Sequence, residues 1–277
     1  MGESRRRPFT YVLRCAVVGY LLLLVVWPLV LVVTHAFEGG AGTVLGLFAE
    51  PGTLAALRLT ALAAVLATAI NLVFGVAISL VLVRVQFPGK RILSALVDLP
   101  LAVSPVVVGL ALMLVYSGRT GWFGPTLESW GLTVIFSTPG IVMATAFVSL
   151  PLVVREVVPV LHEIGTEQEQ AAASLGASGT QTFWRITLPS IKWAVVYGVV
   201  LTLARSLGEF GAVKVVSGNV LGQTRTATLA VEEMYLNFDQ QGAYAIAFLL
   251  ASVSVLAILI VSVLRSRAER TERKATP

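Results

Sequence analysis

Charged residues, cysteine and histidine are all scarce in this sequence. Only 13% of its 277 residues are charged, whereas a soluble domain carries about 25%. A chain with so little charge cannot cover a globule with a solvated surface, so the composition excludes an ordinary soluble enzyme and a disordered segment. The single cysteine, Cys15, excludes an internal disulfide bond, and the two histidines, His35 and His162, are too far apart in sequence to suggest a metal site.

Apolar residues are abundant instead. They make up 56% of the chain, and the mean hydropathy is +0.86. A helix needs roughly 20 apolar residues to cross the hydrocarbon core of a bilayer. The runs that meet this requirement are 15–34, 59–83, 99–116 (with a start near Ile92), 134–154, 193–213 and 243–264. Because helices satisfy their own backbone hydrogen bonds in lipid, the sequence predicts an all-α integral membrane protein with six transmembrane helices.

The Lys and Arg residues predict the orientation of these helices. With the N-terminus inside, 15 of the 20 lie in inside segments and 4 in outside segments, while Arg205 lies within the fifth run. Lys and Arg are enriched in the cytoplasmic loops of membrane proteins, so both termini are predicted to be cytoplasmic. The net charge of +5 is therefore interpreted as a sign of orientation and not of nucleic-acid binding. The first run is too long for a signal peptide and lacks a small-residue cleavage site, which predicts a retained anchor. The predicted organisation is a basic N-terminus (1–14), one transmembrane domain (15–264) and a basic tail (265–277) that contacts anionic lipid headgroups.

The longest inside loop, 157–191, carries helix signals. Thr166 followed by Glu169 matches a capping box, in which a hydroxyl and a carboxylate three residues apart cap a helix start. The Ala-rich run 170–175 then predicts a helix, and Gly176 predicts its end, because glycine tolerates the left-handed conformation there.

A second short helix is predicted over 180–187, and Pro189 is predicted to break the chain before the fifth run. Two interpretations of this loop stay open from its pattern alone. Either its small residues present a flat surface to a partner, or it is a surface helix that joins two spans.

The residues of this loop match a known signature. It reads Glu-Ala-Ala, three residues, Gly, nine residues, Ile, one residue, Leu-Pro, and it is found in bacterial ABC-importer permeases. The matching residues are Gln170, Ala171, Ala172, Gly176, Ile186, Leu188 and Pro189. The one departure is Gln170, where the family has Glu, and Glu169 stands one place earlier to supply the charge.

Five further stretches make the chain resemble the sulfate/thiosulfate permeases within this class. They are 98–107, 151–156, 175–179, 204–213 and 215–218. The last two resemble the CysW type of subunit more than the CysT type. Molybdate permeases share much of the fifth-run motif, so molybdate or tungstate stays an alternative substrate.

The resemblance implies the fold and division of labour of a type I ABC importer. Two permease subunits pair in a prokaryotic plasma membrane, this one with a CysT-type homologue or with a second copy. Two ATP-binding subunits dock inside, and an extracytoplasmic sulfate-binding protein delivers the anion. The helix 170–176 is then the coupling helix, with Glu169, Ile186, Leu188 and Pro189 also at the ATPase contact. The chain itself has no P-loop, because Gly89-Lys90 lacks the upstream Gly and the following Ser/Thr, so it is predicted to be no enzyme and to need no cofactor.

Arg205 and Glu209 stand four residues apart in the fifth run, which places them on one helix face within pairing distance. Charges within a bilayer usually face the protein interior or water. One interpretation is a buried ion pair that packs the span. The other places the pair beside the anion path, where Arg205 attracts an oxyanion and Glu209 limits how tightly it is held. Ser104 in the third run is a further pathway candidate.

Pro100 and Pro105 are predicted to bend or interrupt the third run. Broken helices often line transport paths, although a packing kink explains the same pattern. Asp98, near the start of this run, is predicted to cap a helix or to pair with Lys90 or Arg91.

A self-sufficient secondary transporter is the rival hypothesis. It predicts inverted repeats and ion-coupling acids within the membrane, but the sequence has no clear repeat and Glu209 is its only deeply placed acid. The outer loop 217–244 is long and acidic, and either contacts the binding protein or folds back as a cap.

Overall fold

The computed structural model describes residues 6–275, and every regular element in that range is a helix. The predicted all-α class is therefore confirmed. The predicted basic segments 1–14 and 265–277 lie partly outside the described residues. Contacts divide the chain into two compact units. One contains the chain up to Glu50 with Val231–Leu249, and the other contains Pro51–Ala230 with the chain from Leu250 onward.

The first unit begins with one long apolar helix. It consists of α1 (Arg6–Leu21), a π-helical turn (Leu22–Val26) and α2 (Trp27–Ala36), followed by α3 (Ala41–Gly46). Nearly all side chains over Thr10–Ala36 are exposed, as expected for a helix that faces lipid or another subunit. Ring contacts of 5.1 Å join the end of α2 to the start of α14 (Gln240–Ala275), through His35 with Tyr244 and Phe37 with Phe248.

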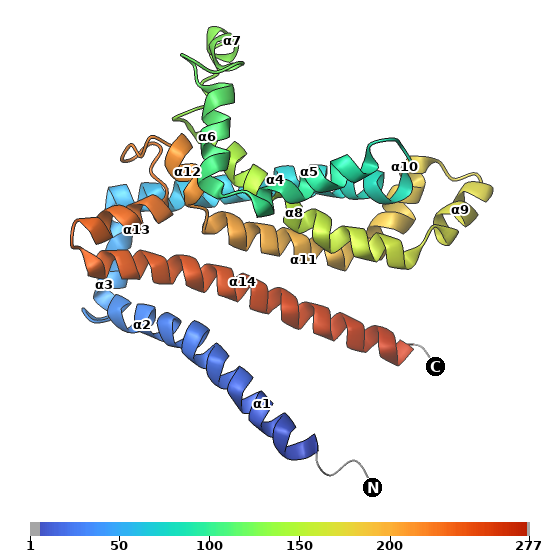
Figure 1. The fold of residues 1–277 in the computed structure, drawn as a ribbon, viewed down its shortest axis with the longest axis horizontal. Helices are drawn as coiled ribbons and strands as arrows, with labels where there is room; N and C mark the ends of the chain where they lie inside the picture. Colours follow the sequence, from blue (N-terminus) through green and yellow to red (C-terminus); the bar gives the residue numbers. More distant parts are fainter. Residues whose placement is uncertain (1–5, 276–277) are drawn as a thin grey trace. The chain divides into compact units, whose positions relative to one another are not determined.

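The core of the second unit is a bundle of three long helices. They are α4 (Pro51–Arg84), α8 (Thr138–Ile164) and α11 (Leu188–Leu207), which lie side by side in Figure 1. Val153 on α8 is fully buried between glycines of the other two helices. A Cβ added at Gly75 would lie 2.8 Å from Val153 Cβ, and one at Gly198 would lie 3.1 Å from Val153 Cα. Small residues at these points let the helices approach closely, which is how helices pack in a membrane.

The third apolar run is broken, as its prolines predict. It forms α5 (Lys90–Ala102) and α6 (Pro105–Tyr116), whose axes differ by 114°. Pro105 is the first residue of α6, where its missing N–H costs nothing. Within residues 6–275, five helices are long and apolar enough to cross a membrane, or six if this bent pair counts as one span.

The remaining helices are short. They are α7 (Gly124–Ser129), α9 (Glu167–Ser174), α10 (Gly179–Thr182), α12 (Gly211–Val216) and α13 (Ala227–Leu236). The predicted break at Pro189 is wrong, because the helix runs without interruption from Gly179 to Leu207. A π-helical turn at Phe183–Thr187 directly precedes Pro189, and the Leu188 N–H bonds to the Phe183 carbonyl five residues back. This wider turn changes the hydrogen-bond pairing just before the proline, which has no N–H to donate.

Candidate functional site

The helix α9 ends as its sequence predicts. Gly176 adopts a φ of +85°, and its N–H bonds to the Ala173 carbonyl at 3.0 Å. The next residue, Ala177, donates its N–H to the Ala172 carbonyl, also at 3.0 Å. These two bonds form a Schellman motif, which satisfies the last carbonyls of the helix and requires a left-handed residue at position 176.

The capping box predicted at the start of α9 is wrong. The Thr166 side chain makes no cap hydrogen bond and instead accepts one from the Gln170 amide at 2.9 Å. Glu169 turns away from the helix start toward Arg84, where its carboxylate meets a full positive charge and not a neutral N–H group. A reciprocal capping box does form one helix later, between Ser178 and Gln181 at the start of α10.

Arg84 makes the contacts that fix this loop, and we call it with Glu169 the Arg84 clamp. Its Nε lies 2.9 Å from Glu169 Oε2, and its Nη2 donates to Glu169 Oε1 at 3.2 Å. Its Nη1 donates to the Leu161 carbonyl at 3.0 Å, and its Nη2 to the Gly165 carbonyl at 2.6 Å. Both side chains are largely buried, with 16% of Arg84 and 20% of Glu169 exposed.

Thr187 extends the clamp to the fifth apolar run. Its buried hydroxyl donates to Glu169 Oε1 at 2.8 Å. The start of α9 is thus tied to the ends of α4 and α8 and to the turn that leads into α11. Sequence reasoning missed this role of Arg84, which it counted only as a topology charge; the one available signal was an arginine that ends a 34-residue apolar helix.

The structure separates the signature residues into an outer and an inner set. Gln170, Ala171, Gly176 and Pro189 are exposed, whereas Ala172, Ile186 and Leu188 are half-buried. Leu188 packs against the buried cluster around Val153. Leu175, beside Gly176, is 89% exposed, so the turn between α9 and α10 presents an apolar side chain to a partner or to water.

The predicted pairing of Arg205 with Glu209 is confirmed, with 2.8 Å between Arg205 Nη1 and Glu209 Oε2. The prediction that both lie in one continuous helix is wrong, because α11 ends at Leu207. Glu209 lies in the break and accepts the Ala212 N–H of α12 at 3.0 Å. A carboxylate at this point satisfies an otherwise unpaired donor of the first turn of α12 and favours the break.

The two partners of this ion pair differ in their surroundings. Only 2% of the Glu209 side chain is exposed, against 40% of Arg205. The backbone carbonyl of Glu209 also accepts a hydrogen bond from the Thr228 hydroxyl at 2.8 Å. Glu209 is therefore held on several sides, while a substantial part of the Arg205 side chain stays exposed.

The break between α5 and α6 lies beside the break between α11 and α12. A Cβ added at Gly211 would lie 2.9 Å from Pro105 Cβ, and one at Gly109 would lie 2.8 Å from the Ala212 carbonyl oxygen. Ser104 precedes α6 as its exposed N-cap residue, and its side chain makes no cap bond. The structure thus brings the region of Ser104 close to the start of α12.

Asp98 lies inside α5 and not at a helix end, and it pairs with neither Lys90 nor Arg91, so both alternatives predicted for it are wrong. It lies two turns farther along α5 and faces α8, where its Oδ1 is 3.0 Å from Arg155 Nε. About half of each of these two side chains is exposed. Over residues 6–275 no group of three or more His, Cys, Asp or Glu side chains is placed to hold a metal ion.

A buried polar network, also missed from the sequence, joins the three core helices. The Asn71 amide on α4 donates to the Ala146 carbonyl at 3.0 Å and to the Ser149 hydroxyl at 2.9 Å, both on α8. Ser206 on α11 donates to the same Ser149 hydroxyl at 3.3 Å. The available signal was the lone amide of Asn71 within an apolar run.

The chain is similar in sequence to known membrane transport proteins. Residues 71–270 match the family described as binding-protein-dependent transport system inner membrane component. The chain is 46% identical to the sulfate transport system permease protein CysW of Synechococcus elongatus, over 92% of this chain and 88% of that one. It is 36% identical to the sulfate transport system permease protein CysT of a Synechocystis species, over 91% and 87%.

A solved structure shares the fold. It is the bacterial alginate ABC transporter in complex with an alginate pentasaccharide-bound periplasmic protein, with a TM-score of 0.76. The match covers 95% of this chain and 96% of that chain at 17% sequence identity.

Proposed function

Because the chain belongs to the family of binding-protein-dependent transport system inner membrane components, we propose that it is the permease subunit of an ATP-driven importer for sulfate or thiosulfate. It moves the anion inward by alternating access, and a separate subunit hydrolyses ATP. The observation that carries the substrate class is the 46% identity to a CysW sulfate permease across most of both chains. The lower identity to a CysT protein favours the CysW role for this subunit.

The proposed topology places both termini in the cytoplasm of a prokaryotic cell. Its support is the concentration of Lys and Arg in one set of loops. In this orientation the loop from Glu167 to Thr187 and the Arg84 clamp face the cytoplasm, whereas α7 and α13 face outward.

In the proposed mechanism α9 seats in a groove of the ATPase subunit. Gln170, Ala171 and Leu175 are exposed and form the contact. The Arg84 clamp then transmits the motion, because it ties the start of α9 to the ends of α4 and α8 and, through Thr187, to α11. A displacement of α9 therefore moves these helices and is not absorbed by a slack loop.

The proposed anion path passes the two helix breaks. In transporters, the ends of discontinuous helices commonly face anionic substrates. Here one guanidinium nitrogen of Arg205 faces Glu209, and 40% of the Arg205 side chain is exposed. Arginine has five N–H donors, so donors beyond those near Glu209 are available in principle to an anion. The carboxylate partly neutralises the arginine, so a dianion is attracted without being trapped. Ser104 at the start of α6 supplies a neutral hydroxyl nearby.

The proposed partners are a CysT-type permease, two ATP-binding subunits, an extracytoplasmic sulfate-binding protein and membrane lipid. Two observations support the second permease and the binding protein. A CysT protein aligns with almost the whole chain, and the alginate importer of the same fold was crystallised with a periplasmic protein.

Reconstitution of the complex tests the proposal. The chain is co-expressed with the CysT-type permease, ATPase and binding protein of its own source and placed in proteoliposomes. We expect sulfate and thiosulfate to stimulate ATP hydrolysis and uptake only when the binding protein is present. Stimulation by molybdate or tungstate alone would show that these anions, and not sulfate or thiosulfate, are the substrates. Uptake driven by an ion gradient without ATP would indicate a secondary transporter.

A further inference from the structure

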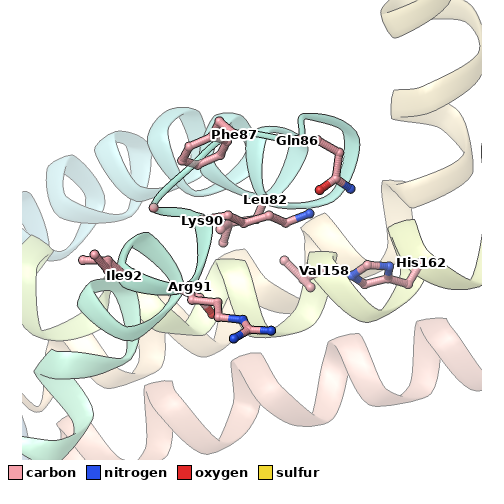
Figure 2. Close-up of a pocket in the computed structure, with 10 residues that line it drawn as sticks. Leu82, Gln86, Phe87, Lys90, Arg91, Ile92, Val158 and His162 are labelled. Carbon is pink, nitrogen blue, oxygen red and sulfur yellow. The ribbon is translucent and has the colours of Figure 1, made fainter.

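A cavity of about 710 Å³ lies where the turn between α4 and α5 meets α8. It lies outside the helix breaks and the Arg84 clamp. Figure 2 shows Lys90 and Arg91 extending on the side where His162 lies on α8, with the Gln86 amide above them. The lining residues are Leu82, Gln86, Phe87, Gly89, Lys90, Arg91, Ile92, Ser94, Val158 and His162.

The charge of this cavity has one sign. Lys90 and Arg91 are cations, His162 adds ring nitrogens, and none of the lining residues is acidic. Asp98, farther along α5, does not line the cavity and pairs with Arg155. The first turn of α5 forms one wall, beginning after Gly89, whose φ is +92°. The start of a helix carries a partial positive charge and N–H groups without partners in the helix, which strengthens the preference for an anion.

An apolar surface leads away from the cavity along α5. Ile92 lines the cavity and is 67% exposed, Leu96 is 57% exposed and Leu99 is 44% exposed. Their spacing of four and three residues places them on one face of the helix. We call these three residues the α5 stripe. A basic cavity at the end of an apolar stripe fits a molecule with an anionic head and an acyl chain.

We propose that this cavity binds the phosphate headgroup of an anionic phospholipid, whose acyl chain lies along the α5 stripe. Lys90 and Arg91 donate to the phosphate oxygens, and Gln86 and His162 supply further donors at the rim. In the proposed topology the lipid comes from the cytoplasmic leaflet, where basic pockets between helices bind such headgroups. Free phosphate or sulfate shares the tetrahedral oxyanion, but only a lipid also uses the stripe.

The test measures binding of phosphatidylglycerol to the assembled transporter by native mass spectrometry and by exchange in nanodiscs. The Lys90→Gln/Arg91→Gln variant is expected to bind it about 30-fold more weakly, since each cation near the headgroups contributes roughly a fivefold factor. Arg14→Gln/Lys192→Gln is the matched control, because it removes two exposed cations outside the cavity and should bind as the parent does. Arg91→Gln alone should give an intermediate loss.

Two further arms separate a lipid from a free anion. Millimolar sulfate or inorganic phosphate is expected to leave phosphatidylglycerol bound, and Leu96→Gln is expected to weaken the lipid while keeping both cations. Equal binding of phosphatidylcholine, or an unchanged affinity in the Lys90→Gln/Arg91→Gln variant, would overturn the proposal. Displacement by free sulfate or phosphate would overturn it in favour of a soluble anion. None of these readouts involves transport, so the result stands apart from the proposed sulfate uptake.

Discussion

Replacing Arg84 with methionine leaves three acceptors without their donor. The Glu169 carboxylate loses its ion pair, and the Leu161 and Gly165 carbonyls lose their hydrogen bonds. Removing one partner of a buried pair costs about 3–5 kcal/mol, so we expect Arg84→Met to lower the amount of assembled complex severalfold. The measurement is complex yield by size-exclusion chromatography after mild solubilisation.

The double variant Arg84→Met/Glu169→Met separates stability from coupling. It leaves no stranded charge, so most of the assembly should recover although the Leu161 and Gly165 carbonyls still lack their donor. In this variant α9 is no longer tied to α4 and α8. We expect ATP hydrolysis to continue while sulfate uptake per ATP falls at least about tenfold, an apparent loss of roughly 1.4 kcal/mol of coupling. A double variant that transports at the parental ratio would show that the clamp is structural only.

The pair of Arg205 and Glu209 allows a test that keeps the helix break intact. Glu209→Gln retains an acceptor for the Ala212 N–H, and Arg205→Met removes the charge that this change would strand. If Arg205 meets the anion, the double variant assembles but takes up labelled sulfate at least about tenfold more slowly, because a charge-assisted hydrogen bond is lost. Arg205→Lys should be partly active, since lysine keeps the charge without the planar fork. Parental uptake by the double variant would instead make the pair a packing contact.

At the scale of elements, the end of α9 depends on one backbone angle. A Cβ at Gly176 meets nothing within 4 Å, but its φ of +85° disfavours a side chain, by roughly 1–2 kcal/mol. We expect Gly176→Asp to insert into the membrane and to lose transport, because it adds both strain and a charge at the proposed ATPase contact. Gly176→Asn is the matched control, because asparagine and aspartate both enter the left-handed region occasionally but only aspartate adds a charge. The Asn variant should retain most of the uptake. Normal uptake by a well-expressed Gly176→Asp variant would contradict the proposed role of this turn.

The packing of α4 on α8 depends on the lack of a side chain at Gly75. A Cβ there would lie 2.8 Å from Val153 Cβ, both within the helical core. Overpacking of this kind costs about 1–3 kcal/mol, so Gly75→Leu should lower the thermal unfolding temperature of the complex. Gly19→Leu on α1, where no atom lies within 4 Å of the added Cβ, should leave that temperature unchanged.

The sequence predicts the elements well where the cause is local. Pro105 predicts the break before α6, and Gly176 predicts the end of α9, because each of these residues restricts or permits particular backbone angles at its own position. The break after Leu207 has a local sign in Gly208 and Gly211, which the prediction of one apolar run over 193–213 passes over. Its geometry also depends on non-local contacts, because Glu209 bonds to Thr228 as well as to Ala212. The Arg84 clamp joins residues 85 positions apart, and no periodicity in the sequence reports such a contact.

For the whole molecule, the proposed topology can be tested by cysteine labelling in a Cys15→Ala background. Leu175 is 89% exposed and Trp122 is 83% exposed, so a cysteine at either position is accessible to a reagent. In intact cells an impermeant maleimide should label position 122 and not position 175, because Lys and Arg mark the cytoplasmic side. Labelling of position 175 from outside would reverse the orientation and with it the assignment of α9 to the ATPase.

The inward turn of Glu169 has a consequence for the fidelity of assembly. The Glu169 carboxylate pairs with Arg84 and accepts a hydrogen bond from Thr187 within this chain. The exposed signature position beside it is occupied by Gln170, whose side-chain amide is neutral. In other members of the family a glutamate stands at the position of Gln170. An ATPase whose groove places a cation opposite that glutamate would meet a neutral amide here, and its cation would be buried without a counter-charge. If α9 is the ATPase contact, we expect this chain to form fewer mixed complexes with the ATPase of another importer, because specificity arises as much from an unfavourable wrong contact as from a favourable right one.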